Sequence, residues 1–140
     1  MTIESNKDLA EEFFGKVSNG DLAGAFAMLH DDLAWWSAGG ENLVFSGVLS
    51  KPAFIKSMNG MGAIFPEGLK LVPTSMVAED NRVAVEVSGQ AALSDGRNYE
   101  NLYHFLLTFR DGRIIAAREY HDTLYTKIVL IDGQASNSPV

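Results

Sequence analysis

The sequence predicts an α+β domain in which three helices lie on the concave side of a strongly curved antiparallel sheet and enclose a pocket. Helical periodicity is confined to the first part of the chain, and the chain from Leu69 onward reads as strands and turns. Helices followed by a run of strands are typical of α+β layers. The predicted strands are about twice the usual length of roughly five to six residues. Strands of that length bend and twist, so we expect a curved sheet.

The first helix is predicted over residues 5–17, with Ser5 or Asn6 as its cap. It ends before Asn19 and Gly20, a pair that stops a helix. Apolar side chains recur along it every four positions, which is typical of a helix with one buried face. These side chains are Leu9, Phe13 and Val17.

A second helix is predicted after Asp21, which can cap its first turn. Its apolar face consists of Leu22, Ala25, Phe26 and Leu29. A short strand follows over residues 33–37, and we expect residues 30–32 before it to form a solvated loop. The third helix begins after Ser50, which can cap it, with Pro52 in the first turn. Its apolar side chains are Phe54, Ile55, Met58 and Met61.

Four long strands follow, predicted over residues 69–78, 82–94, 97–110 and 113–124. The last two turns each contain an Asp-Gly pair, at residues 95–96 and 111–112. Asp-Gly between two apolar runs is a strong signal for a β-hairpin. In the second of these strands, Gly89 can serve as a bending point.

The strand over residues 97–110 carries apolar side chains on both faces. One face has Tyr99, Tyr103, Phe105, Leu107 and Phe109, and the other has Leu102, His104 and Leu106. Three helices cannot cover both faces of the sheet in a chain of 140 residues. We therefore expect a second copy of the chain to cover the outer face, which predicts a homodimer.

The composition excludes several classes of partner. Lys and Arg total 11 and Asp and Glu total 18, so the formal net charge is −7. Nucleic acids and anionic membrane surfaces both require a positively charged face. We therefore expect no nucleic acid and no membrane as partners. The absence of cysteine excludes disulfides, thiolate nucleophiles and zinc–thiolate sites.

The chain length fits one domain, predicted over residues 1–134 and followed by a flexible tail over residues 135–140. The first residues do not show the pattern of a signal peptide, and no apolar run approaches membrane-spanning length. A cytoplasmic location is therefore expected.

The order of elements and two motifs resemble a known family. Helix, turn, helix and strand at the N-terminus are followed by long hairpins that contain residues 111–114 (DGRI) and 118–122 (REYHD). This arrangement resembles the SnoaL-like branch of the nuclear transport factor 2-like superfamily over roughly residues 5–124. The resemblance implies a cone-shaped fold, a pocket inside the cone and a dimer. It also implies small-molecule chemistry of the ketosteroid isomerase, polyketide cyclase or limonene-epoxide hydrolase type.

Individual positions match these enzymes unevenly. Ketosteroid isomerases have a tyrosine on the first helix and a base aspartate after the first strand, where this chain has Phe13 and residues 35–37 (WWS). Limonene-epoxide hydrolases have an acidic residue on the last strand, and Glu119 matches it. Their arginine and second aspartate fall near Glu86 and Ser88, which do not match.

The hairpin turns predict which side chains lie opposite one another. If residues 95–96 form a two-residue turn, Ser88 faces Tyr103 and Gln90 faces Asn101. With a three-residue loop over residues 110–112, two polar rows cross three strands. The rows are Ser88–Tyr103–Glu119 and Gln90–Asn101–His121. A two-residue loop would instead turn Glu119 away from Tyr103, because a slip of one residue moves every side chain to the other face.

Simple alternation gives a competing prediction for the strand over residues 82–94. It buries Val83, Val85 and Val87 and exposes Glu86, Ser88 and Gln90 to water. The resemblance directs the polar rows into the cone and favours the polar pocket.

The polar rows suggest acid–base chemistry. Glu119 can act as a base if burial raises its pKa, His121 as a proton shuttle and Tyr103 as a donor to an oxyanion. Asn101 can orient a carbonyl group, or it can pair with Gln90. Each of the first three also has a structural interpretation, as a surface carboxylate, a hydrogen-bonded histidine and a core tyrosine.

Further ligand contacts are predicted on the same face and on the helices. They are Ser88, Gln90, Glu86, Trp35 and Ser37, with Phe13, Phe54 and Met58 as apolar walls. Trp35 and Trp36 alternate across their strand, so only one of them can face the pocket.

Three functions remain open at this point. The first is a cofactor-free enzyme of the isomerase, cyclase or epoxide hydrolase type that acts on a small apolar carbonyl or epoxide compound. The second is binding of an apolar ligand without turnover, and the third is a dimerising module with an idle pocket. The three histidines lack metal-ligand spacing, and the chain has no phosphate loop, dinucleotide fingerprint or serine elbow. We therefore expect no metal and no cofactor.

Overall fold

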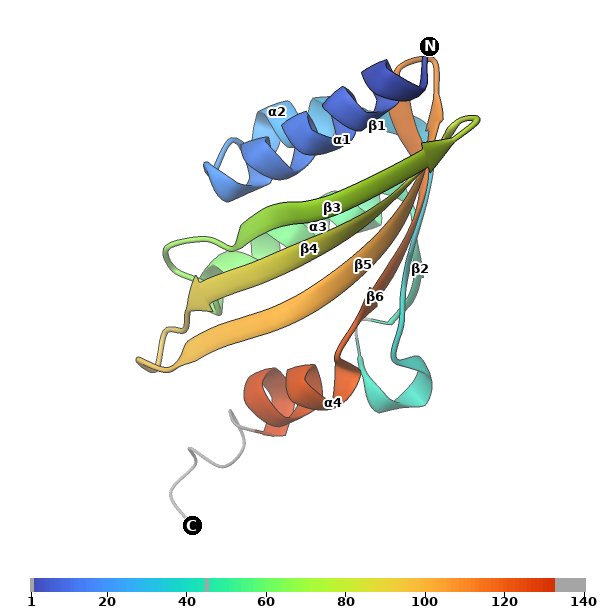
Figure 1. The fold of residues 1–140 in the computed structure, drawn as a ribbon. Helices are drawn as coiled ribbons and strands as arrows, with labels where there is room; N and C mark the ends of the chain where they lie inside the picture. Colours follow the sequence, from blue (N-terminus) through green and yellow to red (C-terminus); the bar gives the residue numbers. More distant parts are fainter. Residues whose placement is uncertain (1, 45, 133–140) are drawn as a thin grey trace.

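The computed structural model describes residues 2–44 and 46–132, in which a six-stranded sheet carries helices on one side (Figure 1). The strands are β1 Leu29–Ser37, β2 Gly47–Leu49, β3 Lys70–Glu79, β4 Arg82–Ala92, β5 Asn98–Arg110 and β6 Arg113–His121. The helices are α1 Ile3–Ser18, α2 Leu22–Ala27, α3 Lys51–Gly60 and α4 Thr123–Thr126, which continues into a π-helical turn, Lys127–Asp132. Short 3₁₀ turns span Gly40–Asn42 and Met61–Ala63. The predicted tail, residues 135–140, lies outside the described residues.

The sheet is strongly curved, and α1, α2 and α3 lie on its concave side (Figure 1). The strand order is β2-β1-β6-β5-β4-β3, and the long strands β3 to β6 pair antiparallel. These features confirm the predicted α+β fold. Neither pairing of β1 was predicted. It pairs antiparallel with β2, a short strand that was not predicted, and parallel with β6, where Ser37 lies opposite Glu119. The parallel pairing brings the first strand beside the predicted site.

Side chains that accept backbone N–H groups fix the helix starts. Thr2 accepts the N–H of Ser5 over 3.0 Å, so α1 begins two residues earlier than predicted. Asp21 and Ser50 cap α2 and α3 as predicted. An oxygen acceptor at this position satisfies one of the free N–H groups of the first turn.

Two further segments differ from the prediction in secondary structure. β1 already begins at Leu29, so residues 30–32 are strand rather than loop and Leu29 is not part of α2. β6 ends at His121, whereas the strand was predicted to reach Leu124. Asp122 caps α4 instead, and the helical segment that follows crosses one end of the concave side (Figure 1).

The hairpin between β4 and β5 has a three-residue loop over residues 94–96, not the predicted two-residue turn. Gly96 takes a positive φ of 88° in this loop, a conformation that glycine adopts without steric cost. Ser88 therefore lies opposite Leu102 instead of Tyr103. The pairing is shifted by one residue, which moves the polar side chains of β4 to the other face.

On β4 the alternation prediction is confirmed and the polar-pocket prediction is wrong. The buried side chains of this strand are Val83, Val85 and Val87. Glu86, Ser88 and Gln90 lie on the convex face, away from the helices, and Glu86 and Gln90 are exposed. These three residues therefore do not belong to the pocket.

The hairpin between β5 and β6 has a two-residue turn, so the predicted three-residue loop is also wrong. Both turn residues, Asp111 and Gly112, have positive φ values, 54° and 74°, as a type I′ turn requires. A β-bulge at Ile115 then adds one residue to β6. The turn and the bulge together shift the pairing by two positions, so every side chain keeps its predicted face.

This double shift places the polar residues of β6 on the concave face. His121 lies opposite Tyr103, and Glu119 lies opposite Phe105. Glu119 was predicted opposite Tyr103, so its partner differs by two positions, but it points to the same side of the sheet.

Two hydrophobic clusters pack against the concave face. The larger one joins α1, α3 and the middle of the sheet through side chains such as Phe14, Trp35 and Phe105. The smaller one joins the end of the β4–β5 hairpin to the C-terminal helical segment and consists of Phe65, Leu93, Tyr99 and Leu130. A cavity lined by residues of both clusters lies between them.

Candidate active site

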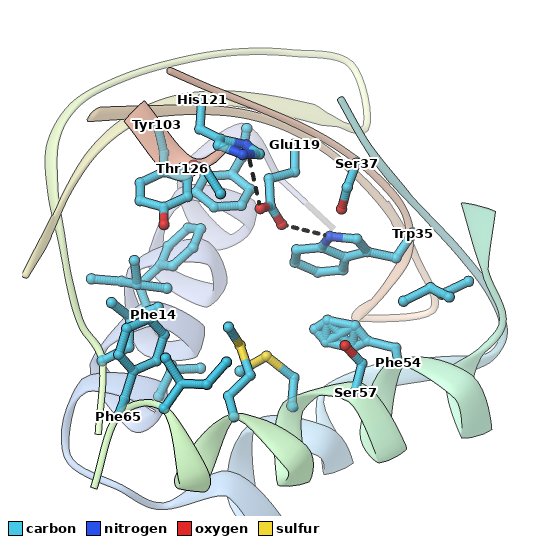
Figure 2. A pocket seen from close by; sticks show the side chains of 18 of the residues that line it. Phe14, Trp35, Ser37, Phe54, Ser57, Phe65, Tyr103, Glu119, His121 and Thr126 are labelled. Atoms are coloured by element: carbon cyan, nitrogen blue, oxygen red, sulfur yellow. Dashed lines mark hydrogen bonds and ion pairs between the residues drawn. The ribbon is translucent and has the colours of Figure 1, made fainter. Parts of the chain in front are cut away.

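The cavity on the concave side has a volume of about 250 Å³ (Figure 2). Most of its lining is aromatic or aliphatic and includes Phe13, Phe14, Trp35, Phe54, Met58, Met61, Phe65, Phe105 and Leu130. The polar lining consists of Ser37, Ser57, Tyr99, Tyr103, Glu119, His121 and Thr126. Apolar cavities with a few placed polar groups are the usual form of small-molecule sites. This cavity is therefore the candidate site.

Glu119 is the only acidic side chain among the described residues that line the cavity. The indole N–H of Trp35 donates to its Oε1 over 2.9 Å, and its Oε2 lies 3.8 Å from Nδ1 of His121 (Figure 2). The side chain is 21% exposed. Burial raises the pKa of Glu119 from 4.5 to about 7, and the hydrogen bond from Trp35 opposes part of this rise.

His121 is more deeply buried than Glu119, with a side chain that is 4% exposed. Its Nδ1 has no hydrogen-bond partner among residues 2–44 and 46–132. Burial lowers the pKa of His121, although Asp122 nearby opposes this change. The lowered pKa favours the neutral form of the imidazole at pH 7.

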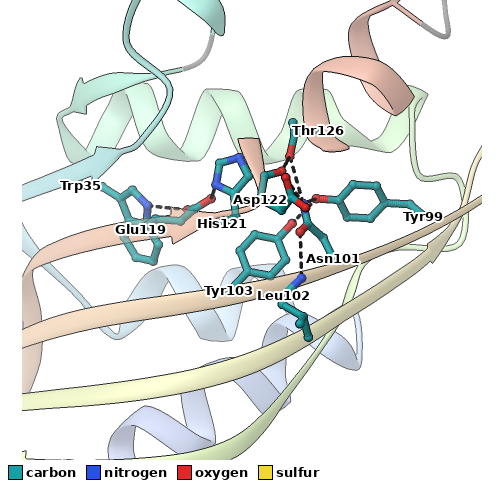
Figure 3. A network of polar contacts seen from close by, with 9 residues as sticks. All are labelled: Trp35, Tyr99, Asn101, Leu102, Tyr103, Glu119, His121, Asp122 and Thr126. Carbon is teal, nitrogen blue, oxygen red and sulfur yellow. Dashed lines mark hydrogen bonds and ion pairs between the residues drawn. The ribbon is translucent and has the colours of Figure 1, made fainter. Parts of the chain in front are cut away.

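Tyr103 and Tyr99 form a hydroxyl pair on β5, with 2.5 Å between their oxygens (Figure 3). Burial raises the pKa of both hydroxyls, so both keep their protons at neutral pH. The ring of Tyr103 stacks on Phe105 and lies against His121, with 5.6 Å between ring centroids in each pair. Tyr103 is therefore held as a potential donor on the wall that carries Glu119.

Asn101 does not line the cavity, so its prediction as a direct ligand contact is not supported by its position. Its Nδ2 donates to the hydroxyl of Tyr99 over 2.9 Å and to Oγ1 of Thr126 over 3.0 Å (Figure 3). Its Oδ1 accepts the backbone N–H of Leu102 over 2.8 Å. The side chain ties β5 to α4 and orients the tyrosine pair.

Besides the polar residues of β5 and β6, the cavity lining brings together predicted residues from three other elements. Trp35 and Ser37 come from β1, Phe13 from α1, and Phe54 and Met58 from α3. The open question about the two tryptophans is resolved by their faces. Trp35 is buried in the cavity wall, whereas Trp36 points to the convex side. There the guanidinium carbon of Arg118 lies 4.0 Å from the Trp36 ring centroid.

Several lining residues were not predicted. Thr126 and Leu130 belong to the missed helical segment, which the capping residue Asp122 and the four-residue spacing of these two could have indicated. Tyr99 also lines the cavity and lies on the same face of β5 as Tyr103. Because side chains alternate along a strand, the sequence could have predicted Tyr99 together with Tyr103.

Within the described residues, no group of three or more His, Asp and Glu side chains is arranged to hold a metal ion. No helix in that part of the chain is both long and apolar enough to span a membrane.

Comparison with known proteins agrees with this architecture. Residues 10–117 match the model of the SnoaL-like domain. No curated protein matches the chain. PrhC from Penicillium brasilianum has a similar structure, with a TM-score of 0.84 and 18% identity over 98% of this chain and 95% of that one.

Two Streptomyces proteins also have the same fold. AclR from Streptomyces galilaeus, a proposed hydroxylase, gives a TM-score of 0.77 and 22% identity over 92% of this chain and 97% of that one. IdmH from Streptomyces antibioticus, a proposed polyketide cyclase, gives 0.75 and 17% over 89% and 97%. The family match spans most of the chain, and together with the fold it shows that this protein belongs to the SnoaL-like family of the nuclear transport factor 2-like superfamily.

Proposed function

We propose that the protein is a cofactor-independent acid–base enzyme that acts on a small, largely apolar carbonyl or epoxide compound. The observation that carries this proposal is a single carboxylate, Glu119, in an otherwise largely apolar cavity. Its pKa of about 7 makes it about half deprotonated at neutral pH. A base with such a pKa is stronger than an ordinary glutamate and still available in its charged form.

On a carbonyl substrate, Glu119 takes a proton from the carbon beside the carbonyl group. The electron pair of that C–H bond forms an enolate, whose oxygen carries the negative charge. Return of the proton to another carbon completes an isomerisation. In a cyclisation the enolate carbon attacks a second carbonyl group, whose oxygen becomes an alkoxide and takes the proton back from Glu119. On an epoxide, the same carboxylate takes a proton from water as the water oxygen attacks a ring carbon. The C–O bond at that carbon breaks, and the freed ring oxygen takes the proton back from Glu119.

The tyrosine pair supplies the donor to the enolate oxygen. Asn101 donates to the hydroxyl of Tyr99. Tyr99 can then direct its own proton to Tyr103 across the 2.5 Å contact, which leaves the Tyr103 proton for the substrate. A donor held in place before the reaction stabilises the developing charge without reorganisation. Asn101 acts through Tyr99 and is a positioning residue.

His121 is placed to relay the proton. Its Nδ1 lies 3.8 Å from Oε2 of Glu119, and the imidazole is neutral and able to accept. A small movement brings the two atoms into hydrogen-bond range. IdmH is a proposed polyketide cyclase, and cyclisation belongs to the class of reaction proposed here.

Binding of an apolar ligand without turnover is the second candidate. It is favoured by the engaged state of the polar groups, since Glu119 already accepts from Trp35 and Tyr103 already contacts Tyr99. A ligand would then be held by the apolar lining alone.

Proton exchange in D₂O tests the enzyme against the binding protein. Small cyclic ketones and 1,3-dicarbonyl compounds are incubated with the protein, and NMR follows the loss of their α-proton signals. We expect Glu119→Gln to slow exchange by about 100-fold or more, because a general base contributes about that much. Affinity for the same compounds, measured by tryptophan fluorescence, should stay nearly unchanged.

The matched control is Glu86→Gln, the same change on the convex face, which should leave exchange untouched. Undiminished exchange in Glu119→Gln would remove the catalytic role. Binding of the compounds without any exchange in the unaltered protein would favour the second candidate.

We also propose that two copies of the chain associate through the convex face of the sheet. Exposed apolar side chains gather there, among them Val72, Val77, Leu102 and Tyr120. The same face carries charges of both signs, including Glu86 and Arg118, which a two-fold arrangement can place against each other.

A further inference from the structure

We propose that Trp35 is a positioning residue whose indole N–H selects the oxygen of Glu119 that serves as the base. The proposal rests on the acid–base function of Glu119. It gives Trp35 a role beyond that of an apolar wall.

The two oxygens of Glu119 have different surroundings (Figure 3). Oε1 accepts the N–H of Trp35 over 2.9 Å. Oε2 lies 3.8 Å from Nδ1 of His121, which is beyond hydrogen-bond distance. A hydrogen-bonded oxygen is a poorer proton acceptor than a free one. Oε2 is therefore the oxygen that takes the proton, and it is also the oxygen nearest to the histidine that can relay it.

The direction of the indole N–H is fixed by packing. The Trp35 ring lies between aromatic rings from three elements, with centroid distances of 4.3 Å to Phe54, 6.0 Å to Phe13 and 6.0 Å to Phe105. The indole cannot rotate unless one of these rings moves. The parallel pairing of β1 with β6 holds the two backbones in register, with Trp35 opposite Ala117. The donor is thus preorganised.

Few other groups control the charge of Glu119. The titratable groups near it are His121 on its own strand and Tyr99 and Tyr103 on β5, and the described cavity residues of α1, α3 and β1 carry no charge. Trp35 is the only side chain in the described residues that donates a hydrogen bond to Glu119. A hydrogen bond to the charged form favours that form. Trp35 therefore keeps part of Glu119 ionised at neutral pH despite its burial.

Trp35→Phe tests the proposal, because it keeps an aromatic ring and removes the N–H. We expect the pKa of Glu119 to rise by about one unit, as loss of a hydrogen bond to a charged group implies. Proton exchange should then fall about fivefold at pH 7 and recover by about pH 9, since the ionised fraction falls from about one half to about one tenth. The matched control is Trp36→Phe, the same change on the convex face.

Two measurements are made in parallel. One is the pH profile of proton exchange, and the other is a ¹³C NMR titration of protein labelled at Cδ of glutamate, with Glu119→Gln assigning the signal. An alkaline shift in both supports the proposal. A loss of rate that is equal at all pH values, with an unchanged titration midpoint, would show that Trp35 only packs and would overturn the proposal.

The NMR titration separates failure of this proposal from failure of the proposed function. If the protein exchanges no substrate proton, the enzyme proposal fails, while a midpoint that rises in Trp35→Phe still assigns the control of Glu119 to Trp35. If Trp35→Phe does not fold, benzothienylalanine at position 35 replaces only the N–H and keeps the indole shape. An unchanged midpoint in that protein would again contradict the proposal.

Discussion

Two sets of polar side chains lie on neighbouring strands of one sheet, one set on each face. Tyr103, Glu119 and His121 face the concave side, where aromatic side chains surround them and the pKa values shift. The second set, Glu86, Ser88 and Gln90, faces the convex side. The residue types are similar, so the chemistry of each set follows from the face on which it lies.

The face in turn depends on loop lengths that differ by a single residue. A loop one residue longer than predicted in the β4–β5 hairpin reversed the predicted face of the β4 set. In the β5–β6 hairpin, the turn is one residue shorter than predicted and the bulge at Ile115 adds one residue, so the side chains of β6 keep their predicted face. The catalytic proposal for Glu119 therefore depends on one bulge.

The largest expected effect on stability comes from comparing Asn101→Leu with Gln90→Leu. Asn101 is buried and its amide joins Tyr99, Thr126 and the backbone of Asp122. Its loss leaves buried donors and acceptors unpaired, which should lower the free energy of unfolding by about 3 kcal/mol. Gln90 on the convex face should change it by less than about 0.5 kcal/mol. Urea denaturation of both variants measures the difference in the free energy of unfolding. Equal losses in the two variants would contradict the structural role of Asn101.

The sequence predicted elements well where the signal was local. Asp21 and Ser50 capped their helices as predicted, and both Asp-Gly pairs lie in hairpin turns. An Asp-Gly pair marks where a turn occurs, but both two-residue and three-residue loops accept it. The face of every residue after such a turn was therefore left open by local signals.

The errors concern contacts between distant segments. The parallel pairing of β1 with β6 joins residues such as Trp35 and Ala117, which are far apart in the chain. No short motif specifies such a pairing. The hydrogen bond from Trp35 to Glu119 depends on it, so the sequence could place Trp35 in the wall but could not show what it orients.

The second expected effect is a pH-dependent gain in stability for Glu119→Gln. The folded-state pKa of Glu119 is raised from 4.5 to about 7, so the charged form opposes folding. This cost is fully present above about pH 7 and disappears as the pH falls toward 4.5. The full shift corresponds to about 3 kcal/mol, and the 21% exposure of the side chain reduces it. Glu119→Gln should therefore be more stable than the unaltered protein by about 2 kcal/mol at pH 8, and equally stable near pH 4.

His121 has the opposite effect on the pH dependence of stability, in the unaltered protein and in Glu119→Gln alike. Its lowered pKa contributes stability above its ordinary value of 6.5, and this is lost as the pH falls below that value. Because both proteins contain His121, its contribution largely cancels in the difference between them. Glu86→Gln, the same substitution on the convex face, is the control. Thermal unfolding of Glu119→Gln and the unaltered protein across pH 4 to 8 measures the difference in stability. A difference that stays constant with pH would contradict the raised pKa of Glu119.

The smallest effect on folding, and a specific effect on assembly, is expected for Leu102→Lys on the convex face. Leu102 is 73% exposed in the single chain, so the substitution should change the stability of one subunit by less than about 0.5 kcal/mol. If the convex face joins two copies, lysine brings an unpaired charge into an apolar contact that buries about 800 Å² or more per partner. The dissociation constant of the dimer should rise at least about tenfold, since one buried charge costs more than 1.4 kcal/mol.

Leu124→Lys is the matched control, because Leu124 is 67% exposed but lies on α4, away from that face. Sedimentation at micromolar concentration should give a dimer for the unaltered protein and for Leu124→Lys, with monomer appearing for Leu102→Lys. A monomer in all three would remove the dimer and leave the convex face as an ordinary solvent-exposed surface.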